Sequence, residues 1–251
     1  MERSKYLFII FLALIVVLLP VAAHPQSAER TAIYRSYIKG DMASWVPVME
    51  RIENESNPSH GRQLELLEYY YGYTGYLISE DRLREARTYI DKGERLIDRI
   101  LTYDPDNVAV QSLKGSFMAY GFAVNKLKAV VSGRESKRLI EESYRKAPDN
   151  VRAVAEMANV YYHAPAMFGR DRDKGAELYG RAAELIEKQG DTNNNWYYIH
   201  LLTVLALHFE ETGDYARAGR IYEKLLRIEP DYVTVRDELY PEFLKRSGGN
   251  F

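Results

Sequence analysis

Residues 199–230, IHLLTVLALHFEETGDYARAGRIYEKLLRIEP, carry the clearest structural pattern of this chain. Apolar residues recur every three or four positions on both sides of a central Thr-Gly-Asp turn, which predicts two amphipathic helices. Gly213 can adopt the left-handed conformation that ends a helix, and Asp214 can cap the start of the next one. Pro230 disfavours helix in the residue before it. The stretch therefore predicts an antiparallel helical hairpin.

A second copy of this pattern begins at Val151 and carries five extra residues, 165–169, in its turn. The matching apolar and small positions are Leu202, Leu205, Ala206, Phe209, Ala218, Tyr222 and Leu225 in one copy and Val154, Met157, Ala158, Tyr161, Gly175, Tyr179 and Ala182 in the other. Segments typical of repeat ends recur at Pro105, Pro148 and Pro230, with a period of about 41 residues. Because one hairpin cannot bury its apolar face alone, the repetition predicts a stacked solenoid.

The whole chain is expected to be all-α, an α-solenoid of about five antiparallel helical hairpins over residues 28–246. The expected hairpins are residues 28–54, 60–103, 107–147, 151–189 and 195–229, followed by a C-terminal capping helix at 232–246. The best repeats are 151–189 and 195–230. Gly72 and Gly115 are predicted to be small positions where helices approach closely, and no alternating β-branched run indicates a strand.

The N-terminus reads as a targeting segment. Arg3 and Lys5 precede an apolar run at residues 6–19, and small residues follow it. The run is shorter than the roughly 17–25 residues that a membrane-spanning helix needs. We therefore predict a signal peptide at residues 1–23 and an exported protein, most simply in a bacterial periplasm; an uncleaved anchor is the alternative.

Composition narrows the classes of function. The chain holds 34 Lys and Arg against 36 Asp and Glu, for a net charge of −2, and no basic block. Nucleic acid and anionic membrane surfaces are therefore not expected as main partners. The chain has no cysteine, which excludes disulfides, cysteine metal ligands and a lipid anchor on cysteine.

Motifs for catalysis and metal binding are missing from the sequence. It contains no Gly-x-Ser-x-Gly elbow, no phosphate-binding glycine loop and no His-Glu-x-x-His. His200 and His208 are eight positions apart on one predicted helix, roughly 12 Å along its axis, which is too far to share a metal. We therefore expect no enzyme activity, no cofactor and no metal.

The hairpin pattern resembles the tetratricopeptide-repeat family. Within it, residues 161–182, YYHAPAMFGRDRDKGAELYGRA, are similar to a turn of bacterial exported repeat proteins, including the T component of tripartite (TRAP) transporters. Arg170 replaces the second glycine of that turn, and Gly175 stands where alanine is usual. The general resemblance implies a non-catalytic scaffold for a protein or peptide partner. The narrower resemblance, that of residues 161–182, implies a periplasmic accessory protein that docks a solute-binding subunit or holds a small apolar ligand.

The geometry that this resemblance implies puts the binding groove on the inner faces of the first helices of the hairpins. The expected groove residues are Arg152, Asn159 and Tyr162 of one hairpin and His200, Thr203, Leu207 and Glu210 of the next. Tyr69 and Tyr73, from the tyrosine cluster at 69–76, are further candidates, with packing between repeats as the alternative. The partner's identity and the oligomeric state are left open.

The inserted turn is the most distinctive loop. Pro165 and Gly169 restrain its backbone, and Met167 and Phe168 form an apolar pair within it. The loop either contacts the groove or a partner, or Phe168 plugs the end of the hairpin while Asp171 or Asp173 caps the next helix.

Overall fold

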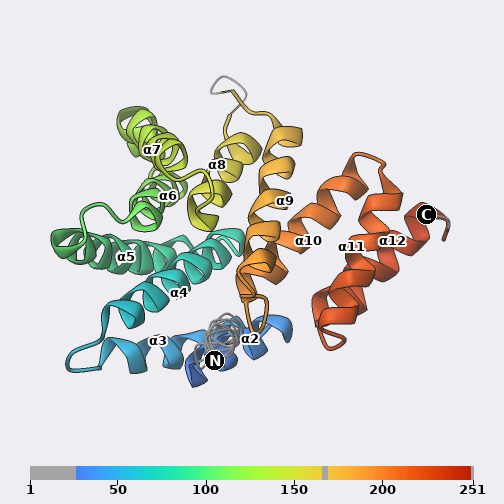
Figure 1. Ribbon diagram of the computed structural model, residues 1–251, viewed down its shortest axis with the longest axis horizontal. Helices are drawn as coiled ribbons and strands as arrows, with labels where there is room; N and C mark the ends of the chain where they lie inside the picture. The colour runs from blue at the N-terminus through green and yellow to red at the C-terminus, as the bar shows by residue number, and fades with distance from the viewer. Residues whose placement is uncertain (1–26, 166–168, 250–251) are drawn as a thin grey trace, which may run out of the picture.

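The computed structural model describes residues 27–165 and 169–249, apart from the side chains of 126–131. These ranges contain eleven α-helices and no strand (Figure 1). The predicted signal peptide, together with Met167 and Phe168 of the inserted turn, lies outside the described residues. None of the helices in the described ranges combines the length and the apolar character of a membrane-spanning segment.

The helices form successive antiparallel hairpins, as predicted. The helices are α2 (Ala28–Ile38), α3 (Trp45–Glu53), α4 (His60–Ser79), α5 (Leu83–Tyr103), α6 (Val108–Val124), α7 (Lys126–Lys146), α8 (Val151–His163), α9 (Arg172–Lys188), α10 (Trp196–Glu211), α11 (Tyr215–Ile228) and α12 (Tyr240–Ser247). The 3-10 turn Met42–Ser44 joins α2 to α3. The all-α, solenoid-like fold is thus confirmed, and the observed hairpins end within a few residues of the expected limits.

Helix starts follow the capping chemistry of the sequence. The side chain of Asp214 accepts a hydrogen bond from the amide of Arg217, and Gly213 has a φ of 79°. Asn195 caps α10 in the same way. At the inserted turn Asp171, rather than Asp173, caps α9. Each cap satisfies an amide that the first turn of a helix leaves without a partner.

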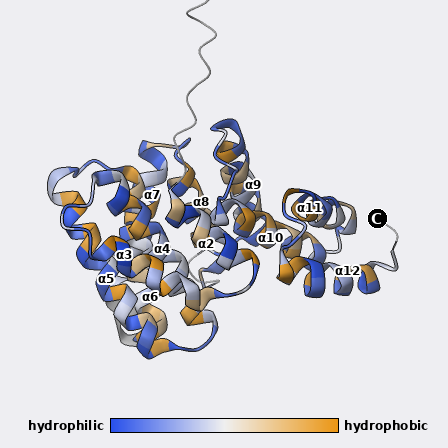
Figure 2. Cartoon of the chain, turned by 90° about the horizontal axis from the view of Figure 1, so that it is seen from below, coloured by the Kyte–Doolittle hydropathy of each residue, from blue (hydrophilic) through white to orange (hydrophobic). Residues whose placement is uncertain are grey.

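The predicted capping helix is divided. Residues 234–239 form a π-helical segment, and α12 follows it. Pro241 lies in the first turn of α12, and proline has no amide hydrogen to continue the ordinary i to i−4 ladder. The end formed by α11 and α12 projects to one side of the molecule in both views (Figure 1, Figure 2).

Gly72 and Gly115 are among the glycines that allow helices to approach closely. A Cβ added to Gly72 of α4 would lie 2.6 Å from the Trp196 ring and 2.9 Å from the Trp45 ring. A Cβ added to Gly115 would lie 2.7 Å from the backbone oxygen of Ser136. The predicted packing roles of Gly72 and Gly115 are therefore confirmed.

The stack does not run in a simple line from the first hairpin to the last. Helices α4, α6 and α8 are neighbours, α10 follows α9, and α2 packs against α10 (Figure 1). Arg30 of α2 donates to the carboxylate of Asp191 at 2.6 Å and to the backbone oxygen of Asn194 at 3.2 Å. The hydroxyl of Tyr34 donates to Glu229 at 3.2 Å. The chain therefore curves far enough for its first described helix to meet its last hairpin.

Candidate functional site

A buried polar network surrounds Arg152 and Glu156 of α8, at the centre of the side on which the groove is predicted, which we call the inner face. The Arg152 guanidinium forms an ion pair with Glu68 of α4 and donates to Glu156 at 3.0 Å. It also lies over the rings of Tyr71 and Tyr197, at 4.7 and 3.9 Å from their centroids. Helices α4, α8 and α10 therefore meet at one buried cation.

Glu156 is fully buried, and each of its interactions is charge-assisted. Besides Arg152, its carboxylate accepts from the Ser116 hydroxyl at 2.6 Å and from the Asn159 amide at 2.8 Å. The Tyr71 hydroxyl donates to it at 3.3 Å. Burial and the nearby negative charge of Glu156 raise the pKa of Tyr71 well above its usual value, so the phenol stays protonated. The Glu156 carboxylate therefore has hydrogen-bond donors from α4, α6 and α8.

An aromatic cluster fills the space beside this network. The rings of Trp45 and Trp196 are 5.2 Å apart between centroids, and Tyr69 lies 6.0 Å from Trp45. Tyr73 packs edge-on against Tyr89 at 4.8 Å. Tyr69 and Tyr73 are each only 3% exposed, so the alternative of packing between repeats applies to both and the groove prediction for them is wrong.

Three more predicted groove residues are buried because neighbouring helices cover them. Arg152 is held in the network described above. The Thr203 hydroxyl donates back to the Ile199 carbonyl at 2.9 Å. The Glu210 carboxylate accepts from Tyr222 of α11 at 2.9 Å and pairs with Arg246 of α12 at 2.8 Å. Arg152, Thr203 and Glu210 thus hold helices together and are not available to a partner.

His200 stays accessible on the inner face. Its side chain is exposed, its Nδ1 lies 3.3 Å from the Tyr37 hydroxyl, and its ring stacks on Tyr197 at 6.0 Å. Surrounding protein desolvates the imidazole, and the positive charges of Arg152 and His163 add to this effect. Together they lower the pKa of His200 to about 4, so it is neutral at pH 7.

Tyr162 is the centre of a second, half-exposed cluster at the end of α8. The Arg172 guanidinium lies 4.5 Å from the centroid of the Tyr162 ring and donates to its hydroxyl at 2.6 Å. The rings of His163 and His208 lie 5.0 and 5.7 Å from that of Tyr162. Arg172 also pairs with Glu211 of α10. The ends of α8, α9 and α10 therefore form one polar and aromatic surface, which we call the Tyr162 surface.

The inserted turn joins α8 to α9 beside the Tyr162 surface. Pro165 and Gly169 are exposed on either side of residues 166–168, and Gly169 has a φ of 86°. The amide of Asp171 donates to the carbonyl of Tyr161 at 2.9 Å, which closes the base of the turn. Asn159 and Leu207 are half-buried on the same two helices, α8 and α10. Of the predicted groove residues, the structure therefore leaves Tyr162, Asn159, His200 and Leu207 accessible.

The sequence pattern did not predict that Arg172 and the buried His208 contact the Tyr162 ring. His208 is 4% exposed, its Nε2 lies 3.4 Å from Asp173, and burial lowers its pKa. The sequence places His208 one helical turn after Val204, but the contact of His208 with Tyr162 depends on how α8 and α10 approach each other. The described residues contain no group of three or more metal-binding side chains.

No protein-family model matches the chain, and no similar curated protein was found. The assignment of a function therefore depends on the geometry of the inner face and of the Tyr162 surface.

Proposed function

We propose that this protein is an exported, non-catalytic tetratricopeptide-repeat scaffold that binds a protein or peptide partner. The binding residues are the accessible part of the predicted groove: Tyr162, Asn159, His200 and Leu207, with the exposed turn residues Pro165 and Gly169 at its edge. The export assignment is supported by the charged and apolar pattern of residues 1–23.

One observation carries the proposal: Tyr162 is half-exposed and at the same time fixed by its neighbours. Arg172, Tyr179 and His208 contact its ring from two other helices. An aromatic residue held in this way loses little conformational freedom when a partner covers it, and Tyr and Arg are the residue types that contribute most to protein interfaces. The surface suits a polar peptide segment with an apolar or aromatic anchor.

Affinity capture from the native cell envelope, with the purified protein as bait, tests the proposal. We expect a partner that the wild type retains and that Tyr162→Ala loses, with a dissociation constant raised by about tenfold or more. Tyr103→Ala is the matched control, because Tyr103 is 51% exposed on α5 and distant in sequence from this surface. A partner that binds both variants equally would place the interface elsewhere, and no retained partner would refute the scaffold proposal.

A further inference from the structure

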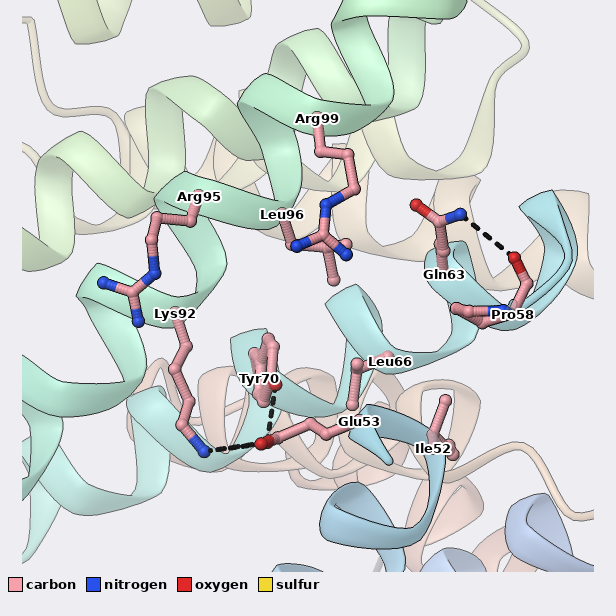
Figure 3. Close-up of a pocket in the computed structure, with 10 residues that line it drawn as sticks. All are labelled: Ile52, Glu53, Pro58, Gln63, Leu66, Tyr70, Lys92, Arg95, Leu96 and Arg99. Atoms are coloured by element: carbon pink, nitrogen blue, oxygen red, sulfur yellow. Dashed lines mark hydrogen bonds and ion pairs between the residues drawn. The ribbon is translucent and has the colours of Figure 1, made fainter. Parts of the chain in front are cut away.

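A pocket of about 240 Å³ lies outside the inner face, between the α3–α4 corner and α5 (Figure 3). Its floor is formed by buried apolar side chains, among them Ile52, Leu66 and Leu96. Its α5 wall carries Lys92, Arg95 and Arg99. Positions separated by three and four residues share one face of a helix, so these three cations point to the same side of α5.

Only one of the three cations is neutralised within the described part of the chain. Lys92 pairs with Glu53 of α3, with its Nζ 2.8 Å from one carboxylate oxygen and 2.9 Å from the other. Arg95 and Arg99 are exposed, and neither has an ion-pair partner among the described residues. Two arginines near the start of α5 are paired, Arg82 with Glu85 and Arg87 with Asp91. The pocket therefore holds an excess of positive charge.

Glu53 shows what kind of group this wall accepts. Its carboxylate is held by Lys92 and by the Tyr70 hydroxyl, the latter at 2.6 Å (Figure 3). Arg99 extends from α5 toward the other half of the pocket, and Arg95 lies beside Lys92 (Figure 3). Two guanidinium groups are planar donors that suit a carboxylate. The negative charge of Glu53 disfavours a ligand with two charges on one group, such as a phosphate dianion.

We propose that this pocket binds a small monocarboxylate, independently of any partner at the inner face. Arg99 donates to the carboxylate, the positive charge of Arg95 adds to the attraction, and a short apolar stem covers Leu66 and Leu96. The small volume limits the ligand to a single ring or a short chain, below the roughly 300 Å³ at which drug-sized sites begin.

The test uses benzoate as the probe, benzyl alcohol as its uncharged equivalent and inorganic phosphate as the competing anion. Titration calorimetry of the purified full chain at low salt is expected to show benzoate binding, and about tenfold weaker binding in R95Q/R99Q. Arg84→Gln is the matched control, because Arg84 is exposed on the same helix and does not line the pocket. Its affinity for benzoate is expected to equal that of the wild type.

A second variant changes the affinity in the opposite direction. Glu53→Gln removes the negative charge beside the ligand, so benzoate is expected to bind more tightly to it. Benzoate binding that R95Q/R99Q leaves unchanged, tighter binding of benzyl alcohol or phosphate than of benzoate, or no binding of benzoate to the wild type would each overturn the assignment. Thermal melting checks that every variant is folded.

Discussion

The centre of the inner face and the Tyr162 surface carry similar side chains but have opposite exposure. Both combine an arginine stacked on tyrosine with a carboxylate partner, Arg152 with Glu156 at the centre and Arg172 with Glu211 at the end of α8. At the centre, Glu68 of α4 and Tyr197 of α10 help to cover Arg152, whose side chain is 7% exposed, whereas the side chain of Arg172 is 44% exposed. The same chemistry therefore stabilises the fold in one place and is available for binding in the other.

Removing Arg152 has the largest expected effect, because it leaves Glu156 buried without its cation. We expect Arg152→Ala to lower the free energy of unfolding by about 3–5 kcal/mol, the usual loss when one partner of a buried ion pair is deleted. Urea denaturation measures this loss in the free energy of unfolding. Arg138→Ala, which removes a solvated arginine of α7, is expected to change the midpoint little. Equal losses in the two variants would contradict the difference between buried and exposed pairs.

Gly72→Ala tests how tightly the aromatic cluster is closed. The added methyl would lie 2.6 Å from Trp196, so we expect a loss of about 1–3 kcal/mol in the free energy of unfolding from overpacking. Gly180→Ala is the matched variant in α9, where an added Cβ meets nothing within 4 Å. That change is expected to stabilise the helix by about 0.5–1 kcal/mol. Thermal melting of both proteins gives the comparison, and a stable Gly72→Ala would mean that the cluster is loosely packed.

The contact between α2 and the turn that joins α9 to α10 makes a smaller contribution. Arg30→Ala removes the ion pair with Asp191 and the hydrogen bonds to the 193–194 backbone. Because both side chains are partly exposed, we expect a loss of about 1 kcal/mol in the free energy of unfolding. Hydrogen exchange is expected to rise in α2 and at the start of α10 and to stay unchanged in α6. Unchanged exchange in α2 would show that other contacts hold it in place.

The smallest expected effect is the pH dependence due to His200. Its folded pKa, about 4, lies below its usual value of 6.5, so folding favours the neutral ring. This contribution is fully present above pH 6.5 and is lost as the pH falls toward 4. Because the side chain is exposed to solvent, we expect no more than about 1 kcal/mol. Urea midpoints at pH 7 and pH 4.5 are expected to differ less in His200→Gln than in the wild type; identical differences would refute a role for His200.

The hairpins and their ends could be predicted from the sequence because their signals are local. Asp214, Asn195 and Gly213 act on amides and carbonyls within one turn of their own positions. The apolar period of each helix likewise identifies the face that must be covered. The exposure of Tyr162 and His200 agrees with their predicted place on the accessible faces of α8 and α10, and their role in binding stays a prediction.

The burial of the other predicted groove residues depended on contacts across the solenoid. Arg152 and Thr203 occupy inward positions of their helices, yet α4 and the C-terminal segments close over them. No spacing along the chain reveals that closure, because it depends on how far the stack curves. The pocket beside α5 also depends on contacts between distant parts of the chain, since Glu53 pairs with Lys92, which lies 39 positions later in the sequence.

The order of residues fixed which segments are helical, where each helix begins and ends, and which face of each helix is apolar, because these properties arise from interactions within a turn or two. The curvature of the stack determined which of these faces are buried and which remain exposed. It brought α2 against α10, buried Arg152 with Glu156, and left Tyr162 at the surface, since burial depends on which helices meet and not on the residue types alone.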